Sequence, residues 1–232
     1  MYTSEFYDDE ITIFSPDGRL LQVEYAKEAV KRGTTTFGLK SKDGVVLIVE
    51  KRITSRLIEL NYMEKIFIID DHIGCAISGL VADAQHLLEI ARIESQINKI
   101  EYNDIISVKE LVGRVCEYKH LYTQLTGVRP FGAALLIAGA DESGYHLYAT
   151  DPSGAFLEYN AVSIGKGSFK SMIYFQRSYR HDLSMDEILR LGVRTLKKVL
   201  RKKFNPKNIE IAVNNETKKF RKLSPFEIQD LV

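Results

Sequence analysis

The 232-residue sequence has no tryptophan, only five prolines and two cysteines, and a formal net charge of only +1. A nearly balanced charge produces no overall field that would attract nucleic acid or an acidic membrane surface. The longest apolar runs, such as Gly132 to Ala140, are far shorter than the roughly 20 residues of a membrane-spanning helix. We therefore expect neither a nucleic-acid partner nor a membrane partner.

Histidine and cysteine show no spacing typical of a metal site. The five histidines are scattered, and Cys75 and Cys116 lie in unrelated segments. The first ten residues lack the basic start and apolar stretch of a secretory signal peptide. We therefore expect a cytosolic protein without a metal or cofactor, in which both cysteines are reduced, buried, small apolar side chains.

A hydrophobic content of 45% is sufficient for a buried core, and no linker, repeat or low-complexity segment divides the chain. We expect one domain across residues 1–232. Periodicity predicts helical stripes starting at Leu80 and Val108 and helices over 168–179 and 184–203. Alternation and apolar runs predict strands over 34–40, 45–50, 66–69, 73–78, 131–138, 145–150, 155–159, 161–164, 209–213 and, weakly, 219–223.

Helices that occur in pairs between groups of strands argue against a doubly wound parallel sheet. The pattern favours an α+β fold in which two antiparallel sheets stack face to face. A pair of helices would cover the outer face of each sheet.

A turn and a short amphipathic helix are predicted over residues 15–33. Pro16 suits the second position of a type I turn that Gly18 closes. Gly33 stands where a left-handed C-terminal cap is expected. A helix this short is marginal alone, so it must pack on the rest of the chain. One face of this helix is apolar and consists of Leu20, Val23, Ala26 and Val30.

The stretch Ser15-Pro16-Asp17-Gly18-Arg19-Leu20-Leu21-Gln22-Val23-Glu24-Tyr25-Ala26 resembles the signature of proteasome core-particle α subunits. Further matches to that family follow in order at Lys51–Ser55, Glu64–Ile66, Ser78–Ala84, Gly127–Gly132 and Asp151–Gly154. The resemblance covers nearly the whole chain and implies a four-layer αββα sandwich of the N-terminal-nucleophile-hydrolase type.

The resemblance also implies a function. Seven such subunits would form an outer ring that gates substrate entry, templates assembly with catalytic β subunits and docks the C-terminal tails of regulatory ATPases or other activators. The chain itself would be non-catalytic. An archaeal ring of identical subunits is favoured by the compact C-terminus, and membership of a eukaryotic mixed ring, cytoplasmic and nuclear, is the alternative.

Two sets of contact residues are carried over from the family. Lys65 would meet the terminal carboxylate of an activator tail in the cleft between neighbouring subunits. Many relatives have arginine in place of Lys27, so a bidentate contact there becomes a point charge. Without the resemblance, Lys65 would be interpreted as a solvated surface lysine. The other expected tail contacts are Glu24, Lys27, Gly79 and Leu80.

Residues 1–14 are expected to form a mobile gate segment, with Ile11–Phe14 extended. Four residues match the cluster that holds such segments open: Tyr7, Asp8, Pro16 and Tyr25. Asp9 stands where many relatives have arginine, and adjacent acids repeated around a ring repel one another. We therefore expect a loose gate.

An alternative function starts from Gly33 and Thr34. In the related β subunits a Gly–Thr bond is cleaved, and the exposed threonine becomes the nucleophile with its own amine as base. Glu50 matches the family's carboxylate, and Lys65 matches its lysine if one residue is deleted. An uncleaved Thr34 has a non-basic amide nitrogen, and cleavage would remove the clearest signature. We therefore expect no catalytic residue, with a Thr34 hydrolase as the alternative.

Two weaker motifs remain. Gly165-Lys166-Gly167-Ser168 has glycines typical of a phosphate-binding loop but lacks the spacing, so a tight turn is favoured. The basic run Lys197–Lys203 fits a helix end whose cations complement the helix dipole better than a nuclear or nucleic-acid signal.

Overall fold

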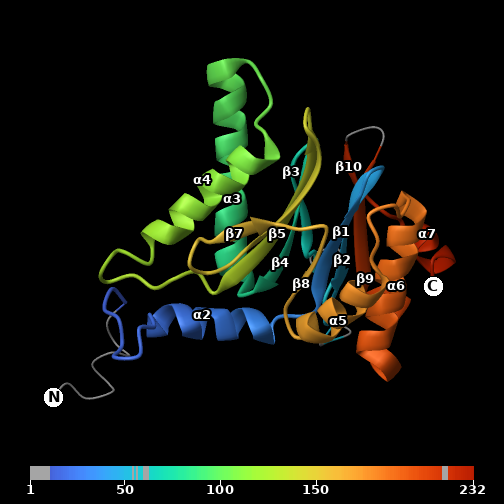
Figure 1. The fold of residues 1–232 in the computed structure, drawn as a ribbon, viewed down its shortest axis with the longest axis horizontal. Helices are drawn as coiled ribbons and strands as arrows, with labels where there is room; N and C mark the ends of the chain where they lie inside the picture. Colours follow the sequence, from blue (N-terminus) through green and yellow to red (C-terminus); the bar gives the residue numbers. More distant parts are fainter. Residues whose placement is uncertain (1–10, 54, 56, 60–62, 216–218) are drawn as a thin grey trace.

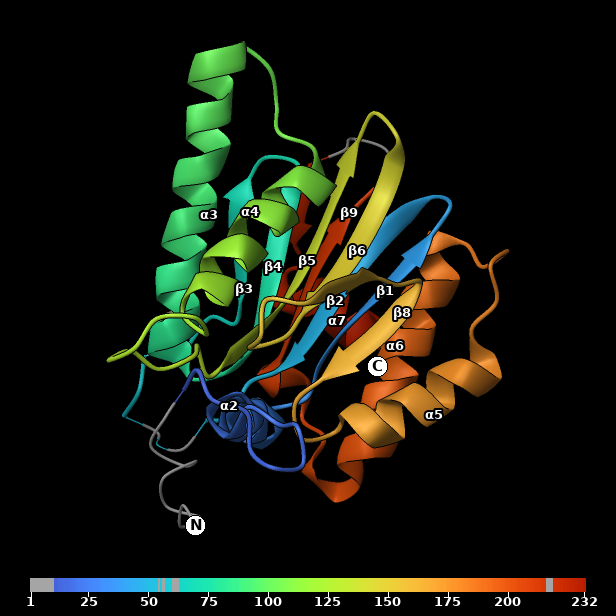
Figure 2. The same cartoon turned by 60° about the vertical axis from the view of Figure 1, so that its left-hand side comes forward.

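The computed structural model describes residues 11–53, 55, 57–59, 63–215 and 219–232. Two five-stranded sheets stack face to face, and helices cover the outer face of each one (Figure 1). Figure 2 shows the same four layers after a rotation, with α3 and α4 on one side and α5 and α6 on the other. The expected αββα sandwich is confirmed.

The first sheet has the strand order β10-β9-β2-β1-β8, and every neighbouring pair is antiparallel. The second sheet has the order β3-β4-β5-β6-β7 and is likewise antiparallel. The strands of the first sheet are β1 (Thr36–Ser41), β2 (Gly44–Glu50), β8 (Ala161–Ile164), β9 (Ile209–Asn214) and β10 (Phe220–Lys222). Those of the second are β3 (Ile66–Asp70), β4 (Ile73–Gly79), β5 (Ala133–Asp141), β6 (Gly144–Thr150) and β7 (Phe156–Glu158).

The helices follow the predicted periodicity closely. They are α2 (Leu21–Arg32), α3 (Val81–Tyr102), α4 (Val108–Leu121), α5 (Ser168–Ser178), α6 (Met185–Leu200) and α7 (Pro225–Asp230), with short 3-10 helices at Arg201–Lys203 and Pro206–Asn208. Ser107 caps α4 by accepting a hydrogen bond from the N–H of Glu110. Ser184 and Ser224 form full capping boxes with Glu187 and Glu227.

Three layers of apolar side chains hold the four layers together. Leu47, Leu136 and Ala212 belong to the buried cluster between the sheets. A second cluster joins α3 and α4 to the second sheet, and a third joins α5, α6 and α7 to the first. Strand β5 is buried along its whole length, which explains its continuous apolar sequence. Truncating one such leucine to alanine costs about 2–5 kcal/mol.

Three local expectations are wrong. Gly33 is extended rather than left-handed, with φ −61° and ψ 161°. Residues 11–13 form bends and no strand. Helix α6 ends at Leu200 rather than at Lys203, because Arg201 has φ +52°, which no α-helix can contain.

Cys75 and Cys116 are free thiols and both are buried, as expected. Burial raises the pKa of both thiols, that of Cys116 to about 11, so neither is a reactive thiolate. Among the helices of the described ranges, none combines the length and apolarity needed to cross a bilayer.

Candidate functional site

The predicted turn ahead of α2 is present. The N–H of Gly18 donates to the carbonyl of Ser15 at 2.8 Å, and Gly18 has φ +78°. The side chain of Ser15 accepts from the N–H of Arg19 at 3.1 Å, which closes the turn a second time. Pro16 lies at the second position and is exposed. The turn therefore sets the direction from which the chain enters α2.

Helix α2 packs its apolar face on β4 and β5, with Val23, Ala26 and Val30 buried. The last carbonyls of a helix lack partners within the helix, and β4 supplies one here. The hydroxyl of Ser78 donates a hydrogen bond to the carbonyl of Val30 at 3.1 Å. A Cβ on Gly33 would lie 2.2 Å from the Ser78 hydroxyl oxygen. Glycine is thus required at position 33 for this close approach and not for a left-handed cap.

A cavity of about 580 Å³ lies between one face of α2 and the end of β4. Its lining includes Gly79 and Leu80 of the expected tail contacts and Tyr25 of the expected gate cluster. Sequence reasoning did not identify the rest of the lining, which is Glu28, Ala29, Arg32 and Gly33. The three- and four-residue spacing from Tyr25 through Glu28, Ala29 and Arg32 is the helical signal that would have grouped them.

Glu24 and Lys27 do not line this cavity. The Lys27 ammonium lies 3.0 Å from the Glu24 carboxylate and 3.9 Å from the carboxylate of Asp151. Asp151 belongs to the Asp151–Gly154 turn beyond β6, where its carbonyl accepts from the N–H of Gly154. Within one chain, the expected tail contacts are therefore divided between two faces of α2.

Lys65, Thr34 and Glu50 do meet. The ammonium of Lys65 donates to the hydroxyl of Thr34, and that hydroxyl donates to the backbone carbonyl of Glu50 at 2.6 Å. The Glu50 carboxylate accepts from the N–H of Thr35 at 3.3 Å. Burial lowers the pKa of Lys65, and the carboxylates of Glu50 and Glu210 oppose this shift.

This arrangement has the side chains of a threonine hydrolase but not its chemistry. The nitrogen of Thr34 is part of the peptide bond with Gly33 and cannot act as a base. The Thr34 hydroxyl already donates a hydrogen bond to a backbone carbonyl and accepts one from the Lys65 ammonium. The three groups therefore pin the start of β1 to β2 and β3.

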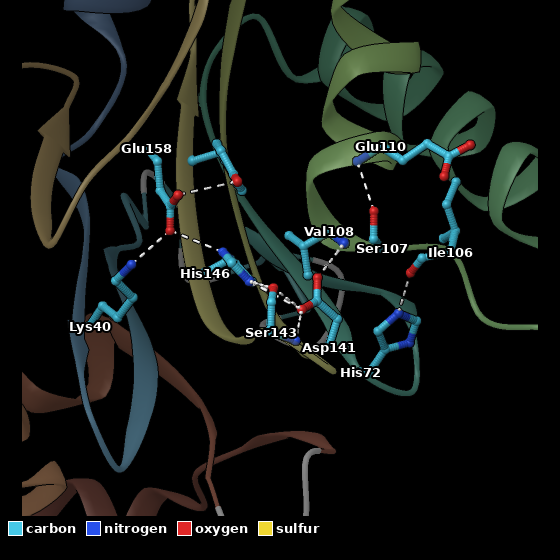
Figure 3. Close-up of polar contacts among 11 residues, drawn as sticks. Lys40, His72, Ile106, Ser107, Val108, Glu110, Asp141, Ser143, His146 and Glu158 are labelled. Carbon is cyan, nitrogen blue, oxygen red and sulfur yellow. Dashed lines mark hydrogen bonds and ion pairs between the residues drawn. The ribbon is translucent and has the colours of Figure 1, made fainter.

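A second polar cluster surrounds His146 at the outer end of the second sheet (Figure 3). The Nε2 atom lies 2.8 Å from the Ser143 hydroxyl and 3.1 Å from Asp141 Oδ1, and Nδ1 lies 3.0 Å from Glu158 Oε1. The Ser143 hydroxyl donates to Asp141 at 2.6 Å. Its proton is thus directed to a carboxylate, and serine, histidine and acid do not form a nucleophilic relay.

The cluster instead joins five elements, which are α4 and the strands β1, β5, β6 and β7. Asp141 accepts from the N–H of Val108 at the start of α4, and Glu158 pairs with Lys40 of β1 at 2.7 Å. Burial would raise the pKa of Asp141, but hydrogen bonds from Ser143 and Val108 hold that pKa below its ordinary value. The carboxylate therefore stays ionised and ties the β5–β6 hairpin to α4.

The other residues singled out in the sequence are placed as follows by the structure. Tyr7 and Asp8 lie outside the described residues. Gly165–Ser168 forms a tight turn, as favoured, with Gly165 at φ +84° and the N–H of Ser168 donating to the Gly165 carbonyl. Lys197 and Lys198 lie in the last turn of α6. In the described part of the chain, no group of three histidine, cysteine, aspartate or glutamate side chains is arranged to hold a metal ion.

Comparison with known proteins gives matches along nearly the whole chain. Residues 30–214 match the family model of proteasome subunits, and residues 7–29 match that of the N-terminal signature of α-type proteasome subunits. The chain is 53% identical to the proteasome alpha subunit of Methanosarcina mazei over 227 residues, which cover 97% of this chain and 91% of that protein. It is 51% identical to those of Methanothermobacter thermautotrophicus and Archaeoglobus fulgidus, with coverages of 97% and 92% in each case.

Proposed function

Since the chain belongs to the proteasome subunit family as an α-type, non-catalytic member, we propose that it forms a seven-membered outer ring. This ring narrows the entrance of the particle, templates assembly with β subunits and docks the C-terminal tails of activators. The alternative of a Thr34 hydrolase is wrong, because the α-type signature lies in the segment that cleavage at Gly33 would remove.

The observation that carries the docking proposal is the division of the tail contacts between two faces of α2. Gly79 and Leu80 line the cavity on one face, whereas on the other face Lys27 pairs with Glu24 and lies near Asp151. A cleft shared by two adjacent copies accounts for this division. One copy supplies Gly79 and Leu80, and its neighbour supplies Glu24 and Lys27.

Lys65 supplies the charge that a terminal carboxylate needs. A tail carboxylate near its half-buried ammonium would favour the charged form that burial disfavours. One charge-assisted hydrogen bond contributes about 1.5–3 kcal/mol. Such a contact is weak alone, but several tails on one ring act together through effective concentration.

For the gate, we propose that Pro16 transmits tail binding to residues 1–14 of a single domain spanning residues 1–232. Three hydrogen bonds between Ser15 and Arg19 close the turn, so a displacement of Pro16 would be passed to the chain that precedes it. Tyr25 lies on α2 beside the cavity that Leu80 lines, which couples the gate cluster to the docking site.

Electron microscopy of the purified protein tests the ring, and seven-membered rings are the expected result. Fluorescence anisotropy with a labelled activator-tail peptide then tests docking. Lys65→Met should weaken binding by about tenfold or more, whereas Lys42→Met, in the exposed β1–β2 turn, should not. Amidating the C-terminus of the peptide should weaken its binding to the wild-type protein by the same factor as the Lys65→Met substitution does. Equal binding of the free-acid and amidated peptides would contradict carboxylate capture.

A further inference from the structure

A second cavity, of about 780 Å³, lies beyond the C-terminal end of α2. It is lined from four parts of the chain, around residues 32–35, 50–52, 166–170 and 199–203. Figure 1 shows α2 running toward α5, with the lower end of α6 beside α5. The cavity therefore brings together the Gly165–Ser168 turn and the end of the basic run Lys197–Lys203, two motifs that the proposed function does not use.

The lining is strongly basic. Seven of its side chains are cationic: Arg32, Arg52, Lys166, Lys170, Arg201, Lys202 and Lys203. Among the described residues that line the cavity, Glu50 has the only carboxylate, and it already accepts a hydrogen bond from the N–H of Thr35. Within the described ranges, none of the seven cations has a carboxylate within salt-bridge distance, whereas Lys40, Lys99, Arg114 and Arg129 all do.

Unpaired like charges around one concave surface repel one another, and an anion in the cavity relieves that repulsion. This concentration stands out because the whole chain has a net charge of only +1. Several cations arranged around one space favour a ligand that carries several negative charges in a small volume.

The backbone adds donors to the cations. Helix α5 begins at this cavity, and its N-cap residue Gly167 provides no side-chain cap. The N–H groups of Phe169 and Lys170 lie in the first turn, where the helix itself offers no acceptor. Backbone N–H groups at the start of a helix, together with its dipole, favour phosphate oxygens.

Arg201 is held in an unusual conformation beside the cavity. Its φ of +52° and ψ of −121° lie outside the regions that residues with a side chain prefer. This strain ends α6 and starts the 3-10 turn whose three residues, all basic, line the cavity. Strained residues of this kind persist where the surrounding structure requires them, often at binding sites.

We propose that this cavity binds an oligophosphate, meaning a compact anion of two or more linked phosphate groups. Arginine forks and lysine point charges both suit phosphate oxygens. The exposed ring of Phe169 and the side chains of Val199 and Leu200 provide an apolar wall beside the cations. Inorganic polyphosphate and nucleoside triphosphates share this chemistry. The proposal does not depend on tail docking.

Isothermal titration calorimetry of the purified full-length protein with inorganic triphosphate, without divalent metal, tests the proposal. We expect saturable binding that weakens steeply as salt is raised from about 50 to 200 mM. The double variant Lys166→Gln/Lys170→Gln should weaken binding by about tenfold or more. The control Lys197→Gln/Lys198→Gln removes the same charge from the same basic region but outside the lining, and should change affinity by less than about twofold.

Arg201→Gly separates binding from folding. Glycine adopts positive φ without strain, so the melting temperature of this variant should rise while its affinity for triphosphate falls. ATP binding more tightly than triphosphate would identify a nucleotide as the source, and equal affinities would identify inorganic polyphosphate. Absence of saturable triphosphate binding, equal losses in the two double variants, or equally tight binding of an oligo-aspartate peptide would overturn the proposal.

Discussion

The ammonium of Lys65 donates a hydrogen bond to the hydroxyl of Thr34, and that hydroxyl donates its own hydrogen bond to the backbone carbonyl of Glu50. A threonine held from both sides in this way links three strand ends. Thr34, Glu50 and Lys65 thus have a structural role in this chain.

Thr34→Val tests that role. Valine fills the space but leaves the Glu50 carbonyl and the half-buried Lys65 ammonium without this partner. We expect a loss of about 1–3 kcal/mol in the free energy of unfolding, measured by urea denaturation. Thr34→Ser keeps the hydroxyl and should lose less than half as much. Particles assembled with active β subunits should hydrolyse peptides at the wild-type rate with either variant, and a loss of hydrolysis confined to Thr34→Val would contradict the structural role.

Gly79→Ala should be strongly destabilising. Gly79 has φ +108°, and a Cβ there would lie 2.1 Å from the carbonyl oxygen of Gly132. Because backbone would have to move, we expect a loss of more than about 2 kcal/mol. Gly113→Ala is the matched control, because its Cβ meets nothing within 4 Å inside α4. That variant should gain about 0.5–1 kcal/mol. Thermal melting compares them, and similar shifts in both would be evidence against the constraint.

Stability should fall as the solution is acidified. A hydrogen bond from Arg129 is the largest cause that lowers the pKa of Asp83 in the folded protein, while burial opposes it. Burial alone would raise the pKa of Asp70, but hydrogen bonds from Lys99 and Ser95 outweigh burial, so that the pKa is lowered overall. A carboxylate whose pKa is lower in the folded protein stabilises the fold at pH values above its unfolded pKa, which is near 3.8 for both residues. This contribution is lost as the pH falls through the pKa of the folded protein.

The check is the melting temperature between about pH 6 and pH 2. Asp70→Asn should lower stability at neutral pH and flatten the acid slope, because asparagine cannot titrate. Asp182→Asn, at an exposed position with a single exposed arginine partner, should leave the slope unchanged. An unaltered slope in Asp70→Asn would show that other carboxylates control acid unfolding.

At alkaline pH, the contribution of Lys119 to the stability of the fold should change. Its side chain is completely buried and donates to the carbonyl of Ala133 and the hydroxyl of Thr150. Burial lowers its pKa from 10.5 to about 8. The folded protein therefore releases this proton at lower pH than the unfolded chain, so the Lys119 contribution to stability rises between about pH 8 and 10.5.

The comparison for Lys119 is with Lys119→Met, which fills a similar volume and cannot titrate. The difference in unfolding free energy between wild type and variant should shift in favour of wild type as the pH rises through that range. The exposed-residue variant Lys109→Met controls for general charge loss. A pH-independent difference would mean that the pKa of Lys119 is the same in the folded and unfolded protein, which would contradict the expected lowering by burial.

Particular elements show how far the sequence was informative. The helical stripe starting at Val108 predicted the first residue of α4, since helix periodicity is a local property of the sequence. The prediction for Gly33 failed because the reason for that glycine is Ser78, which lies 45 positions away on β4. The end of α6 was placed too far along because the basic residues 201–203 have adequate helix propensity, and the turn at Arg201 depends on the surrounding tertiary structure.

The sequence by itself determined the order and type of the elements, the stacking of two sheets between helix pairs, and the membership signalled by the turn and first helix. These follow from local periodicity, turn chemistry and a linear motif. Only the tertiary structure decided which side chains meet: Lys65 with Thr34, Gly79 with the α2 face that carries Arg32, and seven cations around one cavity. The reason is that contacts between segments far apart in the sequence depend on how the layers pack, and no local sequence pattern specifies which side chains that packing brings together.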